Sequence, residues 1–320
     1  MKRPNKTFTE LIEGCHGLPY PDEQKYAQIT SQLYQFRLQE NWNGHSTGEY
    51  ATVGWILPST AANMLWTNKF RIDHDSRTID ILYAPGNDFE SQVIAEQLHL
   101  AHTQGCLFMS KKLESELYRI LGINRMVRIA RGGSALFGIQ TFGIQMTGYV
   151  RDKETGEMKI WVAKRSSTRM AHPGKMDNTV GGGATADEDH FECMLREAKE
   201  EASLPEKWMR EHAKVVGTIS YFFVRNAKGT GEVGFVDRSL QFIYDVELPS
   251  HVVPKPSDDE VEEFYLWTIA ETIAALKEDR FKSNSGVTLI DFLIRHGYIT
   301  ARDEPELETV ISLIQRRPCL

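Results

Sequence analysis

The sequence predicts an α/β fold for residues 131–320, preceded by a smaller α+β domain over residues 1–130. Extended segments alternate with helical segments along the second part of the chain, which is the pattern of an α/β domain. The 320 residues are enough for about two domains of ordinary size. Hydrophobic residues make up 41% and charged residues 25%, as in an average soluble domain, which excludes a disordered or fibrous chain.

The first 130 residues mix helical and extended patterns. Apolar residues at helical spacing predict helices over residues 22–39 and over most of 91–119, with an interruption near Gly105. Residues 52–58 predict a strand that ends at a proline. The basic, glycine-bearing segment 128–133 is the expected boundary between the two domains.

The second part of the chain is more regular. Residues 142–147 alternate with a period of two, and residues 158–163 are rich in β-forming side chains, so the turn at 153–156 predicts a hairpin. Further strands are predicted at 215–224, 240–248 and 263–269, and helices at 189–202, 270–277 and 285–296.

Charge and cysteine content exclude several classes of protein. The net charge is −7, so no overall positive field is available for a nucleic-acid backbone. The longest uncharged stretch, 132–150, contains five glycines and predicts strands and turns, so we expect no membrane span. Four scattered cysteines without zinc-site spacing indicate reduced thiols, and the opening residues lack a secretory signal, so we expect a cytoplasmic protein. The oligomeric state stays open.

A cluster of carboxylates on the predicted helix 189–202 is the main chemical signal. Three glutamates share one sector of the helix, and we expect them to point away from its buried face: Glu197, Glu200 and Glu201. The buried face is predicted to hold Phe191, Leu195, Ala198 and Ala202. Like charges at this spacing destabilise a helix, whereas a hard divalent cation such as Mg²⁺ or Mn²⁺ prefers carboxylate ligands. An arbitrary acidic helix face would be solvated, and only its surroundings favour a metal site.

Residues near this helix supply the other parts of a phosphate site. Gly181 to Gly183 predict a flexible turn that lets a ligand approach the backbone closely. Glu188 precedes Arg196 by eight residues, and we expect the two side chains to pair. Upstream, residues 158–176 hold five basic residues and no acidic one: Lys159, Lys164, Arg165, Arg169 and Lys175. They are candidates for neutralising phosphate oxygens, although a solvated surface is an equal alternative for each.

These residues carry a resemblance to a known family. Gly182, Glu188 and the run Arg196-Glu-Ala-Lys-Glu-Glu-Ala-Ser-Leu204 resemble the Nudix box, the signature of hydrolases that split a diphosphate linked to another group. Ala198 stands where a larger aliphatic residue is common, and Ser203 replaces the usual glycine after the helix. Neither departure removes a carboxylate. The resemblance implies a Nudix-type mixed sheet between helices.

Further segments are similar to the thiamine-pyrophosphokinase-related branch of the Nudix proteins, which carries an extra N-terminal domain. They are residues 165–168, 173–174, 177–178, 281–284 and 291–297, with a weaker echo at 54–58. This resemblance implies hydrolysis of thiamine diphosphate, or of its oxidised derivatives oxythiamine and oxothiamine diphosphate, to the monophosphate and phosphate. The box alone permits a broad nucleoside-diphosphate-linked hydrolase equally well. A Nudix-fold module that binds a ligand without cutting it is the alternative from another class.

The resemblance also implies roles for single residues. Glu200 and Glu201 are implied as metal ligands, and Glu197 as a further ligand or as the base that orients water. The Gly182 carbonyl is a weaker ligand candidate. Residues 256–264 resemble the segment of the branch that holds an acid outside the box, which singles out Glu260.

Six other conspicuous side chains have ordinary structural explanations. Arg295 and His296 are expected to end the last helix before Gly297. We expect structural roles for two further histidines and core positions for two aromatic residues: His172, His190, Trp161 and Tyr221.

Overall fold

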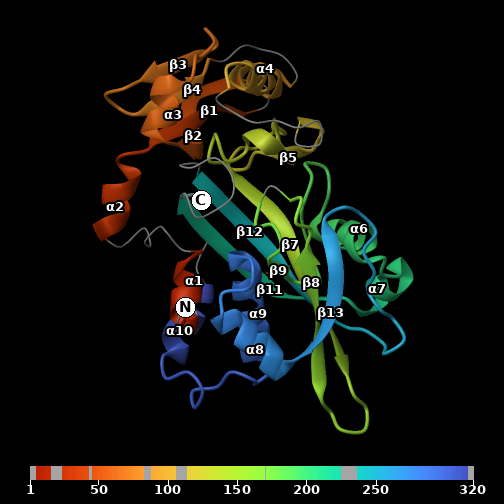
Figure 1. Cartoon of the computed structure of the whole chain (residues 1–320). Coiled ribbons are helices and arrows are strands. Elements are labelled where there is room, and N and C mark those ends of the chain that lie inside the picture. Colours follow the sequence, from red (N-terminus) through yellow and green to blue (C-terminus); the bar gives the residue numbers. More distant parts are fainter. Residues whose placement is uncertain are drawn as a thin grey trace.

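The computed structural model describes residues 5–15, 24–42, 45–82, 88–105, 114–169, 171–224 and 236–315. Figure 1 shows one sheet formed by the first part of the chain above a larger sheet formed by the second. The helices are α1 (Phe8–Glu13), α2 (Gln24–Thr30), α3 (Pro58–Asn63), α4 (Phe89–Thr103), α6 (His190–Ala202), α7 (Glu206–His212), α8 (Ile269–Lys277), α9 (Ser283–Arg295) and α10 (Leu307–Ile314), with a 3₁₀ turn at Arg131–Gly133.

The strands fall into three sheets. The first sheet contains β1 (Tyr34–Trp42), β2 (His45–Ile56), β3 (Phe70–Asp73) and β4 (Thr78–Ile81) in the order β2-β1-β4-β3. A small pair follows, β5 (Leu117–Arg119) and β6 (Arg128–Ala130). The largest sheet contains β7 (Gln140–Arg151), β8 (Met158–Arg165), β9 (Met176–Asp177), β10 (Val180–Gly183), β11 (Lys214–Val224), β12 (Val236–Glu247) and β13 (Val261–Thr268).

The largest sheet is mixed and lies between helices, so the predicted α/β class is confirmed. Its main path is β11-β12-β7-β8-β13, with β10 added to β7 and β9 added to β8. β12 runs parallel to β7, whereas β8 and β10 run antiparallel to it. Successive residues of β8 face opposite sides: Ile160 packs in the core with α8 and α9, and Trp161 packs in the core with α6.

Most predicted elements of the second part are confirmed. The hairpin forms between β7 and β8, where Tyr149 pairs with Ile160. The predicted helices correspond to α6, α8 and α9, with ends that differ by two residues or fewer. After α9, Gly297 has φ +76°, and His296 bonds to Asp245 on β12, as expected of a helix end.

The predicted helix over residues 22–39 is only partly correct. A helix covers Gln24–Thr30, but Tyr34–Trp42 is a strand. Tyr34, Phe36 and Leu38 are buried and the residues between them are more exposed, which is the period of two of a half-buried strand. Apolar residues at positions 33 and 36 also fit a helical spacing, and the pairing with β2 and β4 decides in favour of the strand.

Two hydrophobic contacts cross the predicted boundary at residue 130, which itself stays a prediction. Phe137 and Ile139 pack in the core of the first sheet with Phe36 and Ile79. In the other direction, α1 packs against α8, α9 and α10, where Ile12 is fully buried. The two parts of the chain are therefore interlocked at both ends of the first domain.

Two features bear on the environment of the protein. Cys15 and Cys193 are buried free thiols, while the other two cysteines lie outside the described residues. In the described part of the chain, no helix combines the length and the apolar character that crossing a bilayer requires.

Candidate active site

The position of the glutamates is determined by helix α6, which is fixed by a capping residue at its start and by its buried face. The Asp189 carboxylate accepts hydrogen bonds from the backbone N–H groups of Phe191 and Glu192, at 2.7 and 3.0 Å, and thereby caps the first turn. Ala198 and Ala202 are fully buried against the sheet. The predicted helix is thus confirmed together with most of its apolar face.

The glycine run is a strand, so the predicted turn is wrong. Gly181 to Gly183 belong to β10 and pair with β7 in antiparallel register. A Cβ atom on Gly182 would lie 2.0 Å from the carboxyl carbon of Glu197, and the Gly181 N–H donates to Oε2 of Glu201 at 2.9 Å. Glycine is needed at position 182 because α6 brings the side chain of Glu197 directly onto this strand.

Arg196 holds the acidic side chains of the site in place. Its Nε and Nη2 donate to the two carboxylate oxygens of Glu188 at 2.8 and 2.9 Å, which confirms the predicted pair. Its Nη1 donates to Glu197 at 2.8 Å and to Glu200 at 3.1 Å. Nη2 also donates to the Gly183 carbonyl at 3.1 Å, so one guanidinium links α6 to β10.

Glu201 is buried and Glu197 is half-buried, which corrects the expectation that all three glutamates point away from the core. Glu201 is 7% exposed, and burial together with the nearby Glu197 raises its pKa well above the usual value. Burial also raises the pKa of Glu197, with Arg196 opposing the effect and Glu200 and Glu260 adding to it. The negative charge gathered here is only partly compensated by Arg196.

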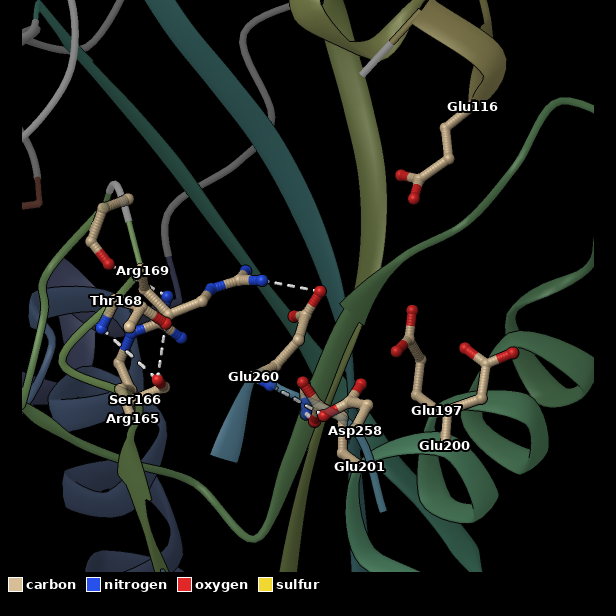
Figure 2. Close-up of polar contacts among 12 residues, drawn as sticks. Glu116, Arg165, Ser166, Thr168, Arg169, Glu197, Glu200, Glu201, Asp258 and Glu260 are labelled. Carbon is tan, nitrogen blue, oxygen red and sulfur yellow. Dashed lines mark hydrogen bonds and ion pairs between the residues drawn. The ribbon is translucent and has the colours of Figure 1, made fainter. Parts of the chain in front are cut away.

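Glu260 is brought to the same site from the segment before β13. Its Oε1 lies 2.6 Å from Nη1 of Arg169, and its backbone N–H donates to Asp258 at 2.9 Å. Figure 2 shows Glu260 between Arg169 and the glutamates of α6. Glu260 and Glu197 line one cleft of about 740 Å³, so the acid predicted outside the box lies beside the box glutamates.

The N-terminal part of the chain lines this cleft as well, which the sequence did not predict. Glu116, Tyr118 and Arg131 form one wall, and Nη1 of Arg131 lies 2.5 Å from Oε2 of Glu116. The Tyr118 hydroxyl is so close to β10 that a Cβ atom on Gly183 would lie 2.1 Å from it. The basic character of segment 128–133 was the single visible signal of this contribution.

The five basic residues upstream of the box are paired with acids from elsewhere in the chain. The pairs are Lys159 with Glu157, Lys164 with Glu262, Arg165 with Asp177, Arg169 with Glu260 and Lys175 with Asp279. Arg165 and Arg169 line the cleft. Lys164 lines a separate pocket of about 560 Å³ beside Trp267, so the structure does not place it with the carboxylates.

A smaller pocket of about 210 Å³ adjoins the cleft and shares Tyr118 and Phe142 with it. The His190 ring stacks on Phe242 at 3.9 Å between centroids, and its Nδ1 lies 2.6 Å from the Tyr244 hydroxyl. His190 therefore serves a packing role in the wall of this pocket. Aromatic side chains give the pocket faces that suit a planar ring.

The donor set has the chemistry of a site for a hard divalent cation. As the described side chains stand, no three His, Cys, Asp or Glu residues are grouped closely enough to hold a metal ion. Arg196 lies between Glu197 and Glu200, and the Glu201 carboxylate is bonded to Gly181. The carboxylates of Glu197 and Glu201, whose pKa values are raised, nevertheless fit Mg²⁺ or Mn²⁺, which would supply the missing positive charge.

Comparisons with known proteins agree with this architecture. Residues 144–287 match the model of the NUDIX domain. The chain is 28% identical to the uncharacterized protein YJR142W of Saccharomyces cerevisiae over 323 residues, which cover 97% of this chain and 91% of that protein. It is 33% identical to Nudix hydrolase 20, chloroplastic, of Arabidopsis thaliana over 189 residues, 59% of this chain and 47% of that protein, so it spans about half the length of this relative.

The similarity to solved structures is lower. The Ap4A hydrolase of C. elegans, solved as a binary complex, is 16% identical with a TM-score of 0.35, and the match covers 50% of this chain and 99% of that one. A mixed sheet between helices, with a glutamate-bearing helix against a glycine strand, defines the class: residues 144–287 form a Nudix domain. Two Nudix hydrolases of Arabidopsis thaliana are among the relatives of this domain.

Proposed function

We propose that this Nudix hydrolase splits thiamine diphosphate, or its oxidised derivatives oxythiamine and oxothiamine diphosphate, into the monophosphate and inorganic phosphate. The observation that carries the hydrolytic part is the meeting of opposite charges in one cleft. Glu197 and Glu200 come from α6 and Glu260 from the segment before β13, and Arg165 and Arg169 lie across from α6 (Figure 2). A substrate with metal-binding phosphate oxygens and residual negative charge matches both sides.

The residues of α6 have different roles in the proposed mechanism. In this proposal Glu200 and Glu201 hold Mg²⁺ or Mn²⁺, with the Gly182 carbonyl as a weaker ligand, and Glu197 is either a further ligand or the base that orients water. When bound, the cation would act as a Lewis acid that withdraws charge from a diphosphate oxygen. Arg196, fixed by Glu188, keeps the carboxylates of Glu197 and Glu200 in one orientation.

The chemical step is a simple displacement. A water oxygen forms a bond to one phosphorus, the bridging P–O bond breaks, and the departing phosphate keeps the bonding electron pair. The proton of the water passes to a carboxylate, for which Glu197 and Glu260 are the candidates. Arg165 neutralises phosphate oxygens on the opposite wall.

The thiamine part of the proposal is supported by residues outside the box. Segments 165–168, 281–284 and 291–297 resemble the thiamine-related branch. The aromatic pocket beside the cleft offers space for a ring next to the diphosphate. Buried free thiols support a reducing compartment, and we propose the cytoplasm, although the plant relatives are named chloroplastic.

Substrate preference tests the thiamine part. We expect kcat/KM in the presence of Mg²⁺ to be higher for oxythiamine or oxothiamine diphosphate than for thiamine diphosphate. A hydrogen-bonding partner matched to the altered ring contributes about 1–3 kcal/mol, roughly ten- to a hundredfold. ADP-ribose and 8-oxo-dGTP serve as competing substrates. A preference of about tenfold or more for either nucleotide would overturn the thiamine proposal and leave the Nudix mechanism intact.

Charge-removing variants test the site. Glu200→Gln and Glu201→Gln keep the side-chain shape, and we expect each to lower kcat by a factor of roughly a hundred or more while the protein stays folded. Glu192→Gln is the matched control, since Glu192 lies on the same helix but bonds to Arg210 outside the cleft. Near wild-type turnover of either variant at saturating Mg²⁺ would refute the assignment. Excess chelator should abolish activity, and added Mg²⁺ should restore it.

A further inference from the structure

A buried charge cluster on the wall across from α6 has more positive than negative charge. Its centre is Asp177, whose Oδ1 accepts the backbone N–H of Asn178 at 2.9 Å and the Ser285 hydroxyl. Its Oδ2 lies 2.6 Å from Nη1 of Arg165 and 3.8 Å from Nζ of Lys282. Two cations therefore share one carboxylate that already accepts three hydrogen bonds.

Two neighbouring cations are each neutralised by a carboxylate of their own. Arg169 has its own partner in Glu260, and Lys175 has one in Asp279. Within the described ranges, Lys282 forms no ion pair within 4 Å other than the long contact to Asp177. After Arg165 neutralises Asp177, the ammonium of Lys282 remains as an uncompensated charge.

Both cations face the cleft and have unused hydrogen-bonding capacity. Arg165 is 7% exposed, and its Nε has no hydrogen-bond partner among the residues described. Arg165, Lys282 and Asn284 all line the cleft of about 740 Å³ that contains Glu197 and Glu200. A buried donor without a partner is costly, and an oxyanion in the cleft is the natural acceptor.

The local fold adds to the positive potential. Lys282 directly precedes α9, a helix of 13 residues whose first turn carries no acidic residue. The helix dipole therefore points its positive end toward the same region. The pKa of His172 agrees with a positive potential in this region. Burial lowers this pKa from 6.5 to about 4, and the charges of Lys282 and Arg165 contribute to the decrease.

We propose that Lys282, Arg165 and Asn284 form an oxyanion subsite that holds a phosphate group of the substrate across the cleft from the glutamates of α6. Lys282 supplies the uncompensated charge, and Arg165 supplies the free Nε–H. Asn284, whose Nδ2 donates to the Tyr221 hydroxyl at 2.9 Å, positions the start of α9 at the cleft wall. The role in catalysis rests on the proposed function, whereas the affinity for free phosphate does not.

Phosphate binding without metal tests the subsite directly. Inorganic phosphate is titrated into the full chain by calorimetry in the presence of a chelator, so that the carboxylates of α6 cannot contribute through a cation. We expect Lys282→Met to raise the Kd by tenfold or more, because the uncompensated charge is lost. Lys207→Met on α7 removes the same charge from an exposed position and should leave the Kd within twofold.

A second variant covers the case in which Lys282→Met fails to fold. Asn284→Asp places a negative charge in the subsite, at a helix start where aspartate is favourable, so folding should be retained. We expect this variant to raise the Kd for phosphate by tenfold or more as well. Folding of each variant is checked by thermal unfolding.

The outcomes separate this inference from the proposed function. Phosphate binding that is lost in both variants supports the subsite even if no diphosphate is hydrolysed. Equal affinity in wild type, Lys282→Met and Asn284→Asp, or no binding to wild type, overturns the subsite even if hydrolysis is observed. With an active enzyme, Lys282→Met should raise KM for the diphosphate far more than it lowers kcat, since the lysine binds and does not react.

Discussion

Gly182 shows how one missing side chain determines the position of a functional group. Because a Cβ atom there would lie 2.0 Å from the Glu197 carboxyl carbon, Gly182→Ala must displace Glu197 from Arg196. We expect activity to fall by tenfold or more and the free energy of unfolding to fall by about 1–3 kcal/mol. Gly217→Ala on β11 is the control, since nothing lies within 4 Å of its Cβ position. A fully active Gly182→Ala variant would contradict the close approach.

His172 gives a prediction on pH dependence. Its pKa is lowered to about 4 by burial and by the charges of Lys282 and Arg165, against 6.5 for a free histidine. The unfolded chain therefore takes up a proton at a higher pH than the folded protein does. The contribution of His172 is fully present above pH 6.5 and is lost as the pH falls from 6.5 toward 4.

Removing the titrating group should flatten this dependence. His172 has φ +51°, a conformation that asparagine tolerates, so His172→Asn keeps the backbone. We expect the free energy of unfolding in urea to decrease less for His172→Asn than for wild type between neutral pH and about pH 4.5. Parallel decreases would show that His172 is not the group responsible.

At the scale of the element, the end of α6 makes a separate prediction. Ser203 caps the helix in the left-handed region with φ +52°, a conformation that costs a residue with a side chain about 1 kcal/mol relative to glycine. Ser203→Gly should therefore raise the melting temperature, whereas Ser203→Ala, which keeps a Cβ atom, should not. Destabilisation by glycine would mean that the serine hydroxyl has an additional role.

Helix α6 was predictable because its determinants are local. The capping residue Asp189, the apolar spacing and the glutamate spacing all lie within one stretch of chain, and each is a consequence of 3.6 residues per turn. The acid at Glu260 followed from a sequence resemblance of similar local character. These parts of the site needed no knowledge of which strands pair.

The glycine strand β10 and the ion pairs of the basic residues could not be predicted from local sequence. Glycine suits a turn and a strand equally, and only the fold shows why no larger residue is present on β10: Glu197 packs against Gly182, and Tyr118 packs against Gly183. Lys164, Arg165 and Arg169 have no acidic residue within five positions in sequence, yet each has an acidic partner in space. The excess of positive charge lies instead at Lys282, far along the chain, because two cations share Asp177.

At the scale of the whole molecule, helix α1 belongs to a hydrophobic core that is completed by the C-terminal helices. Ile12 on α1 is fully buried, and it packs in the core that α1 forms with α8, α9 and α10. We expect Ile12→Ala to lower the free energy of unfolding by about 2–4 kcal/mol, as for a central core residue. Glu13→Ala, at an exposed position of the same helix, should have little effect. Equal stability of the two variants would refute the docking of α1.

The docking of α1 on α9 and α10 also has a consequence for biosynthesis. During translation, α1 leaves the ribosome before α9 and α10, which follow only after about 270 further residues, roughly 15–60 s at typical elongation rates. Throughout that interval Phe8 and Ile12 lack the α9 and α10 side chains of their core. The core that contains α1 therefore completes its fold late in synthesis, and a nascent chain stalled before α9 leaves α1 exposed to chaperones.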